Sequence, residues 1–98
     1  MIEIPLKGGY EYSKHSFMVN LENNQLLFKQ EYLSYVENPH WIISVYRDSL
    51  PIVMSRALLA NTEITTFSKM NIGRIVFVGK EATLDNLGVD NKLIWVYE

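Results

Sequence analysis

The sequence contains few side chains that could catalyse a reaction, and its two histidines are the first candidates. His15 and His40 each sit beside a predicted turn, where a surface position is expected. No HExxH, GxSxG, CxxC or GxxxxGK[ST] pattern occurs, so the common signatures of metal centres, activated nucleophiles and phosphate loops are missing. We therefore predict that the protein is not an enzyme and that it carries no cofactor.

Two acidic residues near the C-terminus are the only other candidates for chemistry. Asp85 and Asp90 flank Gly88 and could offer carboxylate oxygens to calcium. An EF-hand loop, however, needs a denser series of ligands that ends in Glu. The alternative is that both carboxylates accept hydrogen bonds from backbone amides in turns, as Asx side chains commonly do. We expect no metal site.

The charge balance and composition exclude several classes of partner. Nine Lys and Arg against eleven Asp and Glu give a net charge of -2, and the cations are scattered along the chain, which predicts no nucleic-acid surface. Cysteine is absent, so the fold must be stabilised by packing. The first ten residues lack the basic start and apolar run of a signal peptide, and no apolar stretch is long enough to span a membrane. We expect synthesis in the cytoplasm.

The apolar residues recur mostly at every second position, as they do in a strand with one face toward a core. Trp41, Ile43 and Val45 alternate with Ile42, Ser44 and Tyr46 in this way. The chain as a whole, residues 1–98, predicts one all-β domain: a small barrel or sandwich of six to seven mostly antiparallel strands, with at most one short helical turn, placed in the polar connection 61–71. The expected strands lie within 17–21, 26–36, 41–48, 49–60, 72–79 and 92–98.

The last predicted strand is apolar on both faces. Leu93, Trp95 and Tyr97 point one way, while Ile94 and Val96 point the other. Such a strand is either central, with its second face covered by a loop, or in contact with another chain. A terminal strand can also lie at a sheet edge and pair with a neighbouring subunit.

In their order, these segments resemble a known family, the small baseplate plug proteins of tailed bacteriophages. The resemblance spans nearly the whole chain and rests on "IEIPL", "FMVNL", "QLLFKQEYL", "WIISVYRD", "LPIVMSRALLA", "IGRIVFV" and the closing "DNLGVDNKLIWVYE". The Asp-x-x-Gly loop before the last strand is the most typical element. The chain departs from the family where it has "QEYLSYVENPH" before the Trp strand, and at Ala60 and Asn61 in place of a Gly.

The resemblance implies a structural protein of the virion, located in the tail baseplate. Proteins of this family are small all-β subunits at the centre of the tail tip, between the hub and the spike, and they help to close the tail lumen. The resemblance therefore implies hub and spike proteins as partners. It also implies a homo-oligomer, for which the symmetry of the tail axis suggests a trimer. No catalytic residue is implied.

Five apolar side chains are our candidates for contacts with other virion proteins, and each is equally suited to the core: Trp95, Tyr97, Tyr46, Ile2 and Ile4. Trp41 is expected in the core, because it begins the strand with the strongest β propensity. The alternative function is a monomeric small-ligand-binding β-barrel whose aromatic residues line a pocket. A pocket binder encloses its own concave apolar site, whereas an assembly subunit exposes flat or protruding apolar surface.

Overall fold

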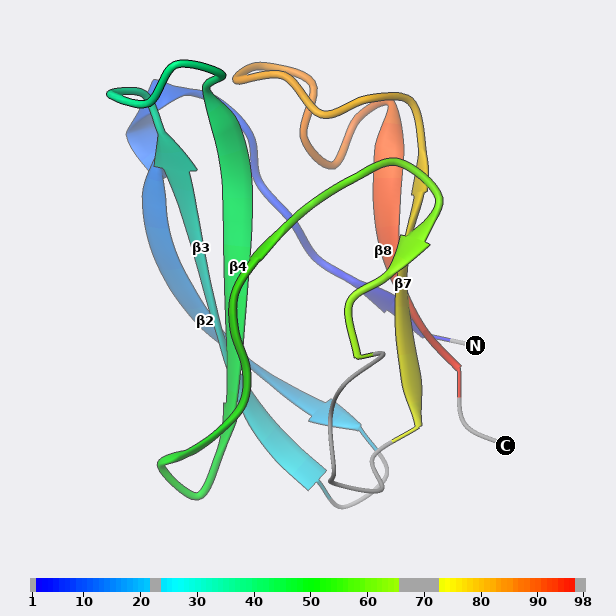
Figure 1. Ribbon diagram of the computed structural model, residues 1–98. Helices are drawn as coiled ribbons and strands as arrows, with labels where there is room; N and C mark the ends of the chain where they lie inside the picture. Colours follow the sequence, from blue (N-terminus) through cyan, green and yellow to red (C-terminus); the bar gives the residue numbers. More distant parts are fainter. Residues whose placement is uncertain (1, 22–23, 66–72, 97–98) are drawn as a thin grey trace.

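Alternating apolar residues build two four-stranded antiparallel sheets, which face each other as the layers of a sandwich (Figure 1). The structure is a computed structural model and describes residues 2–21, 24–65 and 73–96. Neither sheet closes on itself, so of the two predicted architectures the sandwich is confirmed and the barrel is not. The described residues contain eight strands, two of them very short, where six to seven were expected.

The first sheet has the order β1 (Ile2–Ile4), β8 (Asn91–Val96), β7 (Arg74–Gly79) and β6 (Thr62–Glu63). The second sheet has the order β2 (Lys14–Leu21), β3 (Asn24–Leu33), β4 (His40–Arg47) and β5 (Leu50–Ala57). The helical turn is a 3-10 turn, η1 (Tyr10–Tyr12), just before β2. It was predicted within 61–71; β6 occupies part of that range, and residues 66–71 lie outside the described residues.

The core lies between the sheets and follows the predicted alternation. On β4, Trp41, Ile43 and Val45 are fully buried, and the residues between them are half-buried on the outer face. The expectation that Trp41 belongs to the core is confirmed. The indole N–H of Trp41 donates to the carbonyl of Thr83, 2.9 Å away in the loop before β8, so one side chain links the second sheet to the loop of the first.

The strand β8 is central in its sheet. It pairs with β1 on one side and with β7 on the other, and Trp95 lies opposite both Ile2 and Ile75. Of the two positions left open for this strand, central or at a sheet edge, the structure shows the central one. Period-two alternation does not distinguish an edge strand from a central one, and here the three residues of β1 pair with Leu93, Ile94 and Trp95 of β8.

The chain crosses from the first sheet to the second through residues 5–13, and Gln30 of β3 holds this crossing segment in place. The side chain of Gln30 is buried, and its amide nitrogen donates to the carbonyls of Lys7 (2.6 Å) and Tyr12 (3.1 Å). A carbonyl that is removed from water without a hydrogen-bond donor lowers stability by about 1–3 kcal/mol. The two bonds from Gln30 avoid this cost where the crossing segment packs against β3.

Two asparagines organise the loop that joins β7 to β8. The side-chain oxygen of Asn86 accepts from the backbone N–H of Thr83 (2.6 Å), and that of Asn91 accepts from Gly88 (2.7 Å). These are the turn bonds that Asp85 and Asp90 were expected to make, transferred to the residue that follows each aspartate. Gly88 has φ 80 and packs where a side chain would strike the carbonyl of Leu6, which docks the loop on the crossing segment.

The bonds of Gln30 lead to a prediction about stability. Replacing Gln30 by Leu keeps the size of the side chain but removes both donors, so the free energy of unfolding should fall by about 1–3 kcal/mol. Urea denaturation followed by circular dichroism measures the change. Gln25→Leu is the matched control, because Gln25 is exposed on the same strand and should change stability by about 0.5 kcal/mol or less. Equal effects of the two substitutions would contradict the proposed role of Gln30.

An ion pair at the edge of the first sheet leads to a pH prediction. Arg74 donates to Glu63 at 2.8 Å and holds the pKa of Glu63 below its ordinary value of 4.5; burial opposes this shift, and the hydroxyl of Thr65 adds to it. A lowered folded-state pKa contributes stability above the ordinary pKa, and that stability is lost as the pH falls through the folded value. The contribution of this ion pair to stability is small, because the side chain of Arg74 is half-exposed and water screens the attraction.

The melting temperature of the wild-type protein should therefore fall more steeply between about pH 6 and about pH 3 than that of Glu63→Gln. Thermal melts at a series of pH values measure the difference. Glu37→Gln, at an exposed glutamate, is the control and should follow the wild type. Parallel curves for wild type and Glu63→Gln would show that the ion pair does not contribute to stability.

Candidate protein-contact surface

The outer face of the second sheet carries a row of apolar side chains on three neighbouring strands. Met18 of β2 lies opposite Leu27 of β3, and Leu27 lies opposite Tyr46 of β4. Met18 is 54% exposed, and the other two are half-buried. The outer face of a solvated antiparallel sheet is normally polar, so this row, the outer apolar row, requires an explanation.

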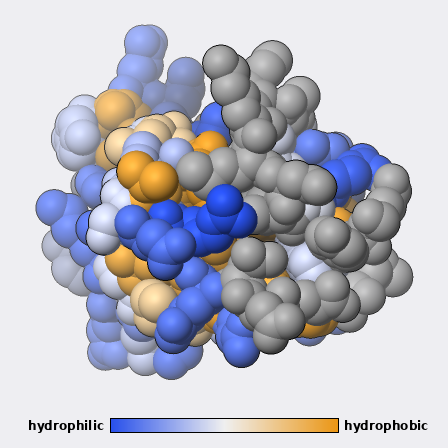
Figure 2. Space-filling model, turned by 90° about the horizontal axis from the view of Figure 1, so that it is seen from below, coloured by the Kyte–Doolittle hydropathy of each residue, from blue (hydrophilic) through white to orange (hydrophobic). Residues whose placement is uncertain are grey.

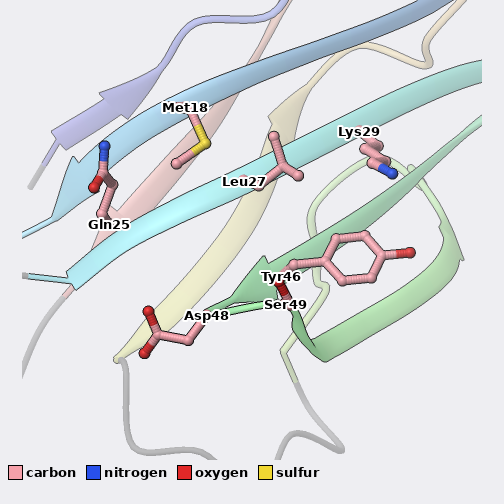
Figure 3. A pocket seen from close by; sticks show the side chains of 7 residues that line it. All are labelled: Met18, Gln25, Leu27, Lys29, Tyr46, Asp48 and Ser49. Atoms are coloured by element: carbon pink, nitrogen blue, oxygen red, sulfur yellow. The ribbon is translucent and has the colours of Figure 1, made fainter.

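The outer apolar row lines a shallow hollow of about 430 Å3, which Figure 3 shows from close by. The ammonium of Lys29 lies 5.1 Å from the ring centre of Tyr46, while Gln25 and Asp48 lie at the other end of the hollow. Asp48 and Ser49 are placed there by the tight β4–β5 turn, in which both have positive φ, 51 and 68. The hollow is open to solvent along its length, which suits a protruding partner better than an enclosed small molecule.

Apolar side chains are also exposed at both ends of the sandwich. Figure 2 views the end at which the β4–β5 hairpin turns, where hydrophobic atoms lie exposed between hydrophilic ones. Leu50 follows that turn and is 57% exposed. At the opposite end, the loops carry Tyr10, Tyr35 and Val89, which are 82%, 81% and 75% exposed. Tyr10 and Tyr35 line a second shallow depression. Aromatic side chains of this kind are enriched in protein interfaces.

The five predicted contact residues fall into three groups. Ile4 and Trp95 are buried in the core of the subunit, so between the two roles left open for them the structure favours the core. Ile2 is 38% exposed on the edge strand β1, and Tyr46 belongs to the outer apolar row. Tyr97 lies outside the described residues. Met18 and Leu27 were missed, although their alternation with the inward Phe17 and Phe28 places them on the outer face.

The residues considered for catalysis or metal binding are dispersed. His15 is half-buried between the rings of Tyr12 (5.2 Å between centres) and Phe17 (5.5 Å), and Nδ1 of His40 lies 2.7 Å from the carbonyl of Asn38. Within the described ranges, no three His, Cys, Asp or Glu side chains are grouped as metal ligands would be. In the same ranges, no helix is long and apolar enough to cross a membrane.

A β-sandwich that exposes apolar groups on one sheet and at both ends has the character of a small structural subunit that works by contact. Comparison with known families agrees with this class. All 98 residues, 1–98, match the family described as cyanophage baseplate Pam3 plug gp18, and the chain belongs to that family. The resemblance to baseplate plug proteins is thereby confirmed. No curated protein matches the chain.

Two isoleucines of one strand provide a test of which apolar residues form the core. Ile4→Ala removes a buried side chain and should lower the free energy of unfolding by about 2–5 kcal/mol. Ile2→Ala, two residues away on the outer rim, should lower it by less than about 1 kcal/mol. Urea denaturation measures both. If Ile2→Ala destabilised the isolated protein as much as Ile4→Ala, Ile2 would belong to the core and could not serve as a contact residue.

Proposed function

We propose that the protein is a non-catalytic plug or hub-associated subunit of a phage tail baseplate, which helps to close the tail lumen and joins the hub to the spike. Membership of the plug family implies a location in the tail baseplate and association with other tail proteins. The observation that carries the proposal is the outer apolar row of Met18, Leu27 and Tyr46, none of which belongs to the buried core of the sandwich.

The size of this surface suggests how the subunit is held. Burying one Met, Leu or aromatic side chain contributes about 1.5–3 kcal/mol, whereas association costs about 4–15 kcal/mol in lost translational and rotational freedom. Three such side chains alone therefore give weak binding. Tight binding in the baseplate therefore needs several contact regions on each subunit, such as the outer apolar row and the exposed tyrosines, or several linked copies of the subunit. Both fit a homo-oligomer around the tail axis, with a trimer as the expected form.

The contact residues that we propose for this role are Tyr46 and Ile2 from the sequence prediction, together with Met18 and Leu27. Each has an exposed or half-exposed side chain in the isolated subunit. Tyr97 stays a prediction. The hub and the spike are the proposed partners, because a plug at the centre of the tail tip lies between them.

A complementation experiment tests the proposal. A phage with a stop codon in this gene should form tails with an open lumen, and wild-type protein supplied in the host should restore closed, infectious particles. The double variant Met18→Ser, Tyr46→Ser should be incorporated at least about 100-fold more weakly, because it loses two buried apolar side chains worth roughly 3–6 kcal/mol together. Quantitative mass spectrometry of purified tails and electron microscopy of the tip measure the outcome.

Leu59→Ser is the control, because Leu59 is 58% exposed in the connection between β5 and β6 and does not line the hollow of the outer apolar row. It should be incorporated as well as the wild type. Closed, infectious particles in the complete absence of the protein would refute the plug function. Normal incorporation of the double variant, with its fold intact by circular dichroism, would refute the role of the outer apolar row.

A further inference from the structure

Four strands lie at the edges of the two sheets, and three of them are poor places for another strand to pair. β1 has three residues and is followed by Pro5, and β6 has two. β5 has eight residues but contains Pro51 and two register shifts against β4, with Ser55 at φ 50. Prolines and bulges of this kind are the devices that keep a sheet edge from pairing with other chains.

β2 is the exception. It has eight residues, Lys14–Leu21, and pairs with β3 in one unbroken register from Lys14 opposite Glu31 to Leu21 opposite Asn24. It contains no proline and no glycine, and its one Lys is at its first position. On the side away from β3, no strand of the described residues pairs with it. An edge that is long, regular and without a central charge is a template for an added strand.

The pattern of the β2–β3 ladder shows which backbone groups are available. The N–H of Tyr32 donates to the carbonyl of Ser13 at 2.8 Å, so the carbonyl of Ser13 points toward β3. In an antiparallel ladder, residues that hydrogen-bond to the partner strand alternate with residues whose N–H and C=O groups point away from it. In this register, the backbone groups that point to the free edge of β2 belong to the even-numbered residues, among them Ser16, Met18 and Asn20.

The core beside β2 is incompletely covered. Phe17 and Val19 face inward on β2 but are only half-buried, whereas Leu26 and Phe28 opposite them on β3 are fully buried. Phe17 stacks on Phe28 with 5.4 Å between ring centres, so it forms the outer margin of the same aromatic packing. In an added strand, every second side chain would point inward and cover Phe17 and Val19. The side chains between them would point outward and lie beside the polar Ser16 and Asn20.

We propose that the free edge of β2 accepts an extended segment of another tail protein, which joins the second sheet as its fifth strand. This inference rests on the proposed function in the baseplate. The segment alternates apolar residues, which pack beside Phe17 and Val19, with polar residues beside Ser16 and Asn20. Main-chain hydrogen bonds hold it in place, as in other strand additions.

A second copy of this chain is the competing occupant, and the described edges argue against it. Copies arranged in a ring contact each other through two different surfaces, so the β2 edge of one copy would need a free strand from the next. The other three described edges are too short or too irregular to supply one. Two β2 edges can pair with each other only around a twofold axis, which closes on a dimer and forms no ring.

A proline substitution at one position of β2 tests the proposal. Ser16→Pro removes an N–H that points to the free edge and breaks no bond to β3, so the subunit should keep its fold. Ser16→Ala is the matched control, since it shortens the same exposed side chain and keeps the N–H. The probe is baseplates purified from the stop-codon phage, which lack this protein. Ser16→Pro should bind them at least about tenfold more weakly than the wild type, and Ser16→Ala should bind like the wild type.

Hydrogen exchange of the wild-type protein gives a second readout that does not depend on a variant. On binding to the same baseplates, the amides of peptides within 14–21 should exchange more slowly, while those of the β5 edge, 50–57, should not change. Wild-type binding without protection of 14–21, or equal binding of Ser16→Pro, would overturn the β2 assignment and leave the proposed function standing. No binding of the wild type would overturn both. If the amides of 14–21 were protected and the isolated protein had the mass of a dimer in solution, the β2 edge would belong to a second copy of the chain, and the inference would be overturned.

Discussion

The buried amide group of Gln30 ties together two sheets that share no strand. The chain leaves the first sheet at Ile4 and enters the second at Lys14, and on the way the carbonyls of Lys7 and Tyr12 approach the buried side chain of Gln30. Gln30 donates to both. Since β1 is hydrogen-bonded to β8, fixing the crossing segment against β3 also fixes where the first sheet lies over the second. The indole of Trp41 does the same on the other side of the core, through the loop before β8. The sandwich is therefore closed by polar bonds at its crossings as well as by apolar burial between its layers.

Much of this architecture could be predicted from the sequence, because the period of two specifies which side chains share a face. The alternation in β4 grouped Trp41, Ile43 and Val45 on one face, with Trp41 expected in the core. That in β8 grouped Leu93 and Trp95 on one face but did not specify which face is buried. Sheet order is different. Whether β8 is central or at an edge depends on β1, whose three residues carry too little periodicity to predict a pairing, and the two residues of β6 carry none. The bonds of Gln30 could not be predicted either, since they join positions 23 and 18 residues apart and leave no local pattern.

The candidate surface was predicted only in part for a related physical reason. In a strand that is apolar on both faces, an aromatic residue can point toward the core or away from it, so the sequence did not distinguish Tyr46 from Trp95. The structure places Trp95 in the core and Tyr46 on the outer face. Met18 was overlooked because its neighbours Phe17 and Val19 carry the core pattern, and a single apolar residue between them is not informative alone. It becomes informative when Leu27 and Tyr46 are found beside it in the same row. Asn86 and Asn91 took the turn bonds expected of Asp85 and Asp90, since an amide can accept from one backbone group and donate to another, whereas a carboxylate only accepts.

Met18 connects the two surfaces to which we attribute contact. Its side chain begins the outer apolar row, and its backbone belongs to the free edge of β2. A strand added to that edge would place an outward residue next to Met18 and cover part of its exposed side chain. The fold itself does not require an apolar residue at position 18: the buried core is built from inward residues of both sheets, Met18 is not among them, and a polar residue there would leave that packing unchanged. Exposed apolar side chains and an unguarded edge both increase the risk of aggregation. Their occurrence together on one strand, while β5 at the other edge of the same sheet has a proline and two register shifts, supports our proposal that a partner covers β2.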